Sequence, residues 1–260
     1  MSDTTPDVVT ERRGAILVLR IDRPEARNAL NPAVMAALGA AVNEADTDPE
    51  IRAVVLTGTG DRAFCAGMDL RAFADGADMS AGDPEAMAGF YRLLAGQVTV
   101  PLVGAANASA VAGGLELLLG CDVIVASSAA QFGLPEVKRG LFAAGGGTFL
   151  GTRVPLGVAL EMNLLGQPIS AERAYQLGLV NAVVAPDEVL ATAVDLAERI
   201  AANGPLAVAA AKELVRLGVV DPARARERLA ELQPVVFGSE DAREGATAFV
   251  EKRPPVWTGR

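Results

Sequence analysis

The chain has 260 residues, of which 51% are hydrophobic, enough to bury the core of one large α/β domain or of a domain with an appendage. Its net charge is −9 and it has no basic cluster, which argues against nucleic acid as a partner. It contains no histidine, which excludes Ser-His-Asp and Cys-His catalysis within one chain and removes the commonest zinc ligand. Acid–base chemistry must therefore use carboxylates, lysine, tyrosine, cysteine or the backbone.

The sequence also bears on where the protein works. The first seven residues are polar and acidic, unlike a secretory signal. The uncharged run 93–115 is broken by polar residues, proline and glycines, so we expect no membrane span. Cys65 and Cys121 lie in apolar contexts without the spacing of metal ligands. These features predict a cytoplasmic protein without a metal site.

The first 130 residues alternate between strand and helix patterns. Residues 8–22 predict two strands around a turn at Arg13-Gly14. Asn31-Pro32 and Asp83-Pro84 are typical helix starts, with a capping side chain followed by proline. The helices are expected to end near residues 46 and 96, and further strands are expected at 53–58, 101–107 and 122–127. Continuous apolar strands between helices indicate βαβ units with mainly parallel pairing.

After about residue 150 the sequence changes to helical patterns. Helices are expected at 155–165, 170–177, 186–202, 205–217, 222–236 and 239–251. We therefore expect an α/β core, residues 1–195, that carries the functional site, followed by a helical C-terminal region, residues 196–260.

Two glycine-containing segments each follow a strand and open a helix: FCAGMDL, residues 64–70, and VAGGLEL, residues 111–117. A helix start presents unpaired N–H groups and the positive end of the helix dipole. Two such N–H groups directed at one point would form an oxyanion hole. Taken singly, either segment also fits an ordinary tight strand-to-helix turn.

Two glutamates are candidates for acid–base work. Glu116 lies among leucines in the first turn of its helix, where the dipole favours its charge and burial opposes it. A capping box would explain it, but Gly113 stands three residues earlier, where that motif uses Ser or Thr. Glu136 follows the strand at 122–127, and on a solvated face it would simply pair with Lys138 or Arg139.

Considered together, the motifs resemble the crotonase (enoyl-CoA hydratase/isomerase) family over nearly the whole chain. The matching segments, in the order the family has them, are RIDRPEARNALN (20–31), AFCAGMDL (63–70), AVAGGLELLLGCD (110–122), AQFGLPEVKRGLFAAGGGT (130–148), AERAYQLGLVNAVV (171–184) and SEDAREGATAFVEKRPPVW (239–257).

The resemblance implies an α/β fold, the crotonase-type spiral of ββα turns with an α-helical C-terminal trimerisation region. It implies homotrimers, usually joined as hexamers (dimers of trimers), and an acyl-CoA thioester substrate. No metal or separate cofactor is implied, because coenzyme A is part of the substrate. By the family pattern, the backbone N–H groups of Met68 and Gly113 hold the thioester oxygen.

The same resemblance implies a binding site for coenzyme A. Lys252 is expected near the phosphates, from this subunit or a neighbouring one. The residues expected along the cofactor portion of the substrate are Ala26, Arg27, Ala66, Asp69, Leu70 and Lys252.

Hydratases of this family use two glutamates that flank a water, and this chain has a glutamate at both matching places. The resemblance implies Glu116 as the base toward water and Glu136 as the proton donor, with the backbone of Ala144 near the water. Ala143-Ala144 replaces the Pro-Gly of many hydratases, which bears on efficiency and acyl preference. We therefore predict an enoyl-CoA hydratase-like carbon–oxygen lyase. The alternatives are an isomerase, hydrolase or special dehydratase of the same fold, or a weakly catalytic acyl-CoA-binding protein.

Overall fold

The computed structural model describes residues 6–79 and 81–260. The two predicted N-terminal strands are β1 (Val8–Arg13) and β2 (Ile16–Ile21), an antiparallel pair joined by a turn at Gly14, whose φ is +58°. Most of the polar start, which we compared with a secretory signal, lies outside the described residues. Across the described part of the chain, no helix is both long and apolar enough to cross a membrane.

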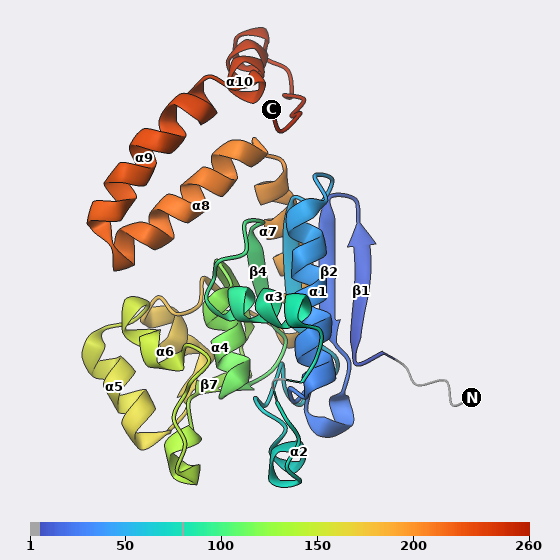
Figure 1. Ribbon diagram of the computed structural model, residues 1–260, viewed down its shortest axis with the longest axis vertical. Helices are drawn as coiled ribbons and strands as arrows, with labels where there is room; N and C mark the ends of the chain where they lie inside the picture. Colours follow the sequence, from blue (N-terminus) through green and yellow to red (C-terminus); the bar gives the residue numbers. More distant parts are fainter. Residues whose placement is uncertain (1–5, 80) are drawn as a thin grey trace.

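The strands form two mixed sheets (Figure 1). The first has the order β1-β2-β3-β4-β6-β9, and all its pairs except β1-β2 are parallel, as predicted. The second has the order β5-β7-β8, with β5 and β7 parallel. The strand bounds are β3 (Ala53–Gly58), β4 (Leu102–Ala106), β5 (Ala110–Val111), β6 (Val123–Ser127), β7 (Gln131–Gly133), β8 (Ile169–Ser170) and β9 (Ala182–Val184).

The helices begin and end close to the predicted positions. Asn31 and Asp83 cap their helices as expected, each accepting a 2.8 Å hydrogen bond from a backbone N–H three residues on. The α-helices are α1 (Pro32–Thr47), α2 (Leu70–Ala74), α3 (Pro84–Leu94), α4 (Gly113–Gly120), α5 (Leu156–Leu165), α6 (Ala171–Gln176), α7 (Val189–Ala201), α8 (Pro205–Val220), α9 (Pro222–Phe237) and α10 (Glu240–Glu251). The 3-10 helices are η1 (Pro24–Ala26), η2 (Glu136–Arg139), η3 (Gly147–Thr152) and η4 (Pro186–Glu188).

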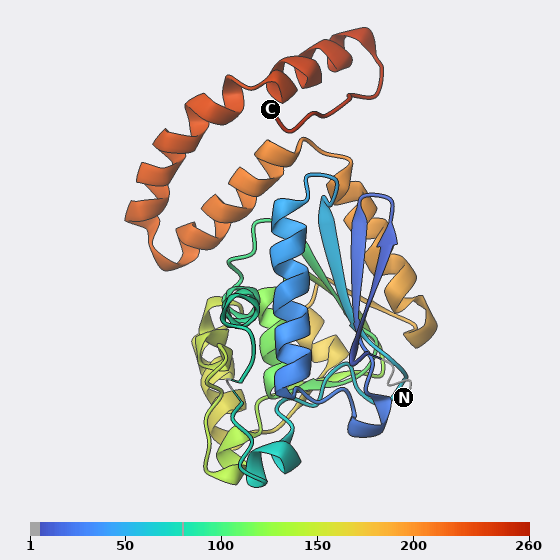
Figure 2. The same cartoon turned by 45° about the vertical axis from the view of Figure 1, so that its right-hand side comes forward.

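Both faces of the large sheet are buried. Successive side chains of a strand point to opposite faces, so each strand contributes to two separate cores. On β2, Leu17 and Leu19 join the core beneath α1, α3 and α4, whereas Ile16 and Val18 join the core beneath α7. Figure 2 shows α1 and α7 on opposite sides of this sheet. The two faces explain why β2 and β3 are continuous apolar runs.

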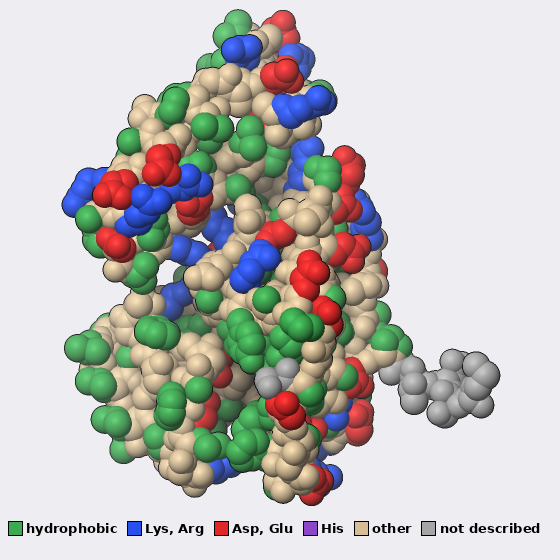
Figure 3. All heavy atoms as spheres, viewed as in Figure 1, with side chains coloured by type: hydrophobic (Ala, Val, Ile, Leu, Met, Phe, Trp, Pro, Cys, Tyr) green, Lys and Arg blue, Asp and Glu red, His purple; other side chains and the backbone are tan. Residues whose placement is uncertain are grey.

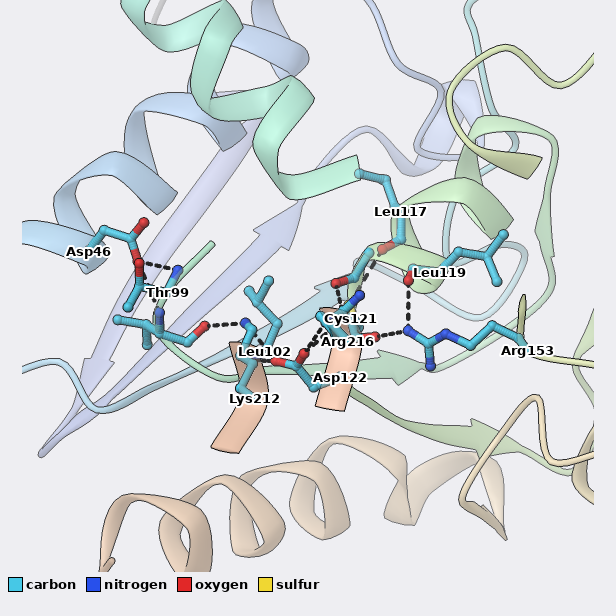
Figure 4. Close-up of polar contacts among 12 residues, drawn as sticks. Asp46, Thr99, Leu102, Leu117, Leu119, Cys121, Asp122, Arg153, Lys212 and Arg216 are labelled. Carbon is cyan, nitrogen blue, oxygen red and sulfur yellow. Dashed lines mark hydrogen bonds and ion pairs between the residues drawn. The ribbon is translucent and has the colours of Figure 1, made fainter. Parts of the chain in front are cut away.

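The last three helices form an arm, α8–α10, that projects from the sheets (Figure 1). The predicted helical C-terminal region is present, and α8 packs along α9. Asp122, just before β6, ties the arm to the core through ion pairs of 2.8 Å with Lys212 and with Arg216 of α8 (Figure 4). Helix α7 lies against the sheet up to Ala201, and the boundary at residues 195/196 stays a prediction.

Candidate active site

The two glycine-containing segments meet at the start of α4. The Leu30 N–H donates to the Gly67 carbonyl at 2.8 Å, and the Leu30 carbonyl accepts from the Asp69 N–H at 2.9 Å. These two bonds form a parallel bridge in which the intervening Met68 N–H takes no part. A Cβ added to Gly113 would lie 3.7 Å from the Met68 nitrogen. Neither N–H has an acceptor among the described residues. The predicted pair of donors is therefore brought together, as a thioester oxygen would require.

Ala112 controls the direction of the backbone at this point. It is the N-cap of α4 with φ +52° and ψ −130°, a conformation that costs a non-glycine residue about 1–3 kcal/mol. Its N–H donates to the Gly133 carbonyl at 2.9 Å, and its own carbonyl accepts from Glu116 at 3.1 Å. Sequence reasoning missed this residue, because an alanine gives no signal of an unusual backbone angle. The strain lies directly beside Gly113, at the candidate oxyanion hole.

Glu116 is 6% exposed, on the first turn of α4. It does not cap its own helix: its Oε1 accepts a 2.9 Å hydrogen bond from the N–H of Gly147, which is 31 residues further along the chain. Burial raises the pKa of Glu116, and the N–H groups of Gly147 and Gly145 oppose that rise. The carboxylate is buried, but it is held by backbone donors.

Glu136 begins η2 and points an oxygen into the protein. Its Oε2 is buried and has no hydrogen-bond partner in the described part of the chain. Burial raises the pKa of Glu136, and the nearby charge of Glu116 raises it further. No ion pair joins Glu136 to Lys138 or Arg139 among residues 6–79 and 81–260, and although the charge of Arg139 lowers the pKa of Glu136, pairing on a solvated face does not account for the buried oxygen. The structure thus brings the two predicted carboxylates within electrostatic reach of each other.

The expected coenzyme A residues fall into two groups. Ala26, Arg27, Ala66, Asp69 and Leu70 lie on two adjoining segments, joined by the Ala66 N–H, which donates to the Arg27 carbonyl at 3.1 Å. The Asp69 carboxylate is already engaged, since it caps α2 and pairs with an arginine at 3.2 Å. Its backbone is engaged as well, because its N–H donates to the Leu30 carbonyl and its carbonyl accepts from the Phe73 N–H, so its place in the coenzyme A site stays a prediction.

Lys252 is the one expected coenzyme A residue that lies apart from the others. It follows α10 at the far end of the arm, whereas α2 and the 26–30 segment lie at the opposite end of the molecule (Figures 1 and 2). A single chain does not bring Lys252 to the other expected ligands. Its assignment requires another subunit and stays a prediction.

The loop after Glu136 approaches Glu116 through its glycines. Ala144 is exposed, and the N–H that binds the Glu116 carboxylate is that of Gly147, three residues later. A Cβ added to Gly145 would lie 2.6 Å from the Oε2 of Glu116, so any larger residue there would have to displace that carboxylate. The run of three glycines, residues 145–147, was the available signal. The role of the Ala144 backbone beside a water stays a prediction.

The comparisons with known proteins all match this chain to the same family. The family model for enoyl-CoA hydratase/isomerase matches residues 11–260. An enoyl-CoA hydratase of Mycobacterium tuberculosis, EchA19, is 39% identical over 270 residues, covering 99% of this chain and 98% of that protein. A carnitinyl-CoA dehydratase of Salmonella typhi is 39% identical over 256 residues, covering 96% and 97%. The crystal structure of an enoyl-CoA hydratase from Mycobacterium tuberculosis superposes with a TM-score of 0.91 at 44% identity, covering 98% of this chain and 100% of that one.

Proposed function

The chain belongs to the enoyl-CoA hydratase/isomerase (crotonase) family of acyl-CoA enzymes, and from this premise we propose that it is a hydro-lyase that adds water across the 2,3 double bond of a 2-enoyl-CoA. The predicted α/β crotonase fold with C-terminal helices is confirmed. The specific reaction is supported by the geometry of the two glutamates.

The observation that carries the proposal is the asymmetry between the two carboxylates. The pKa of both groups is raised by burial, but Glu116 accepts a backbone N–H that opposes the rise, whereas the buried Oε2 of Glu136 has no donor among the described residues. The charge of Glu116 adds to this difference by raising the pKa of Glu136. Such a pair supplies one base and one acid at the same pH. We assign Glu116 as the base and Glu136 as the acid.

The proposed reaction follows from this assignment. Glu116 takes a proton from water as its oxygen attacks C3, and the electron pair of the double bond moves onto the thioester oxygen. The N–H groups of Met68 and Gly113 stabilise that negative charge. Glu136 then protonates C2 and recovers a proton from Glu116, so that one water is consumed for each product.

Conversion of each glutamate to glutamine tests the assignment. We expect E116Q and E136Q each to lower kcat for hydration of crotonyl-CoA by about 10²–10⁴-fold, because each loses one proton transfer. E44Q is the matched control, since Glu44 is exposed on α1, and it should keep wild-type activity. Full activity in either active-site variant would refute the assignment.

A second candidate is dehydration of a hydroxyacyl-CoA that carries a quaternary ammonium group. It is favoured by the carnitinyl-CoA dehydratase relative, at the same 39% identity as the hydratase relative. Dehydration is the reverse of hydration, so the two glutamates exchange the roles of acid and base. Comparing kcat/KM for crotonyl-CoA and carnitinyl-CoA separates the two candidates.

The remaining alternatives have distinct outcomes in the same assay. Movement of the double bond without water uptake would indicate an isomerase, and release of free coenzyme A would indicate a hydrolase. Acyl-CoA binding in calorimetry without turnover of any thioester would indicate a binding protein.

We further propose that the protein acts as a homotrimer or hexamer in the cytoplasm. The arm supports the oligomer, because α8 and α9 contain no buried residue while carrying exposed apolar side chains such as Val219 and Phe237. Light scattering of the purified protein gives the subunit number. A monomer at micromolar concentration would refute the proposal.

A further inference from the structure

Both backbone polar groups of Gly147, its N–H and its carbonyl, form hydrogen bonds with side chains. Its N–H donates to the Glu116 carboxylate at 2.9 Å, and its carbonyl accepts from the Nδ2 of Asn163 on α5 at 3.2 Å. The segment that begins at Gly147, η3, thus lies between α4, which carries Glu116, and α5. A side chain on one helix is linked through a single residue to a carboxylate on another.

The position of this segment determines the position of the carboxylate because there is little free space around it. A Cβ on Gly147 would lie 2.5 Å from the Cβ of Ala143 and 2.8 Å from a methyl group of Leu134. A Cβ on Gly145 would meet the Glu116 carboxylate at 2.6 Å. A shift of this backbone would therefore be transmitted to Glu116 without being absorbed by a gap.

The C-terminal end of η3 is fixed by separate hydrogen bonds. Arg153, which ends η3, donates to the carbonyls of Leu119 and Cys121 at the C-terminal end of α4 (Figure 4). The C-terminal end of η3 is thus anchored to α4. At its N-terminal end, beside Glu116, the side chain of Asn163 holds η3 by its hydrogen bond to the Gly147 carbonyl.

We propose that Asn163 is a positioning residue for Glu116. Its hydrogen bond to the Gly147 carbonyl fixes the peptide whose N–H binds the Glu116 carboxylate. The amide of Asn163 also donates to the Ala159 carbonyl at 3.0 Å, within its own helix. A purely local role in α5 would involve that bond alone. The bond to Gly147 reaches a different element, and its loss would free the peptide that carries the donor to Glu116. The kinetic part of the test rests on the hydratase function proposed above, whereas the spectroscopic part does not.

The test replaces Asn163 by leucine, which keeps the approximate size of the side chain but cannot donate. We expect N163L to lower kcat about tenfold to a hundredfold with KM little changed, since a small misplacement of a catalytic group has an effect of this size. The pH limb that reports Glu116 should move to higher pH, because a weakened Gly147 bond no longer opposes the effect of burial on its pKa.

The matched control is N203L. Asn203 also donates from its amide to the carbonyl four residues back, that of Arg199, at 3.0 Å, and it has no link to η3. N203L should keep the wild-type kcat and pH profile. If N163L also keeps them, or if both variants lose activity equally, the proposal is wrong. Should N163L fail to fold, N163A decides, because alanine removes the donor to Gly147 without adding a charge near Glu116.

An infrared titration keeps the inference testable if the wild-type protein hydrates no 2-enoyl-CoA. The C=O stretch of the protonated Glu116 carboxyl is assigned by its absence in E116Q. We expect this band to persist to higher pH in N163L than in the wild type and in N203L. An unchanged titration in N163L would overturn the positioning role, whereas absence of turnover with a shifted titration would overturn only the hydratase function.

Discussion

The sheet core and the C-terminal arm bury their apolar residues in different ways. All six residues of β3 are buried, and both faces of the large sheet are covered by helices of the same chain. In the arm, α8 and α9 have no buried residue. The space-filling view shows the surface hollowed between the arm and the body, with Lys and Arg side chains in the hollow (Figure 3). The core is completed within one chain, whereas the arm leaves apolar side chains exposed.

The arm is attached through polar contacts. Asp122 binds Lys212 and Arg216 of α8, and Lys212 also donates to the Val100 carbonyl at 2.9 Å (Figure 4). At the other end of the arm, Asp241 accepts the N–H groups of the C-terminal residues Thr258 and Gly259 at 2.7 and 3.0 Å. Apolar packing stabilises the core, and charge pairs and hydrogen bonds orient the arm.

The largest difference between the two regions should appear on truncating an apolar side chain. Leu117 is fully buried in α4, so L117A should lower the free energy of unfolding by about 2–5 kcal/mol. Val219 on α8 is 57% exposed within one chain, and at protein concentrations where the chain is monomeric V219A should change the free energy of unfolding by less than about 0.5 kcal/mol. Urea unfolding measures both. An equal loss in V219A under these monomeric conditions would contradict the comparison.

The polar attachment of the arm gives the next largest effect. D122N leaves the ammonium of Lys212, whose side chain is 9% exposed, without its ion pair. We expect a loss of about 2–3 kcal/mol, less than for a fully buried pair because the Asp122 side chain is 18% exposed. D195N removes the exposed Asp195–Arg199 pair and should have no measurable effect. Equal unfolding midpoints for the two variants would refute the anchoring role.

Within the core, the site should be more sensitive to a single methyl group than the surrounding helices are. G145A places a Cβ 2.6 Å from the Glu116 carboxylate and should lower kcat about 10²-fold by displacing it. G157A on α5 meets nothing within 4 Å, and it should leave kcat unchanged while slightly raising stability. Steady-state assays and thermal unfolding of both variants check this, and wild-type activity in G145A would contradict it.

The smallest expected effect is on the pH dependence of stability. Burial raises the pKa of Glu116 above the ordinary glutamate value of about 4.3, so the native state binds more protons than the unfolded state in the range between the two values. Stability from this group therefore falls as pH rises through that range and stays reduced above it. E116Q cannot ionise, so its Tm should exceed that of the wild type at pH 7. This gain should vanish below about pH 4. A lower Tm for E116Q at pH 7 would contradict the prediction.

Much of the fold was predictable because its signals are local. Apolar runs, the capping residues Asn31 and Asp83 and the change to helical patterns after residue 150 located most elements within a few residues. The strands of the second sheet were missed, because segments of two or three residues have no periodicity to detect. Their pairing depends on contacts between distant segments.

The sequence by itself determined the chemistry available to this protein: no histidine, two glutamates twenty residues apart, and two glycine-containing helix starts. Only the tertiary structure decided how these groups are used. It placed Met68 beside Gly113, gave Glu116 a donor from Gly147 and, within the described part of the chain, left an oxygen of Glu136 without one. It also separated Lys252 from the rest of the expected site. The reason is that residue types specify which charges and donors exist, whereas burial and hydrogen bonding, which set their protonation, arise when segments far apart in the chain pack together.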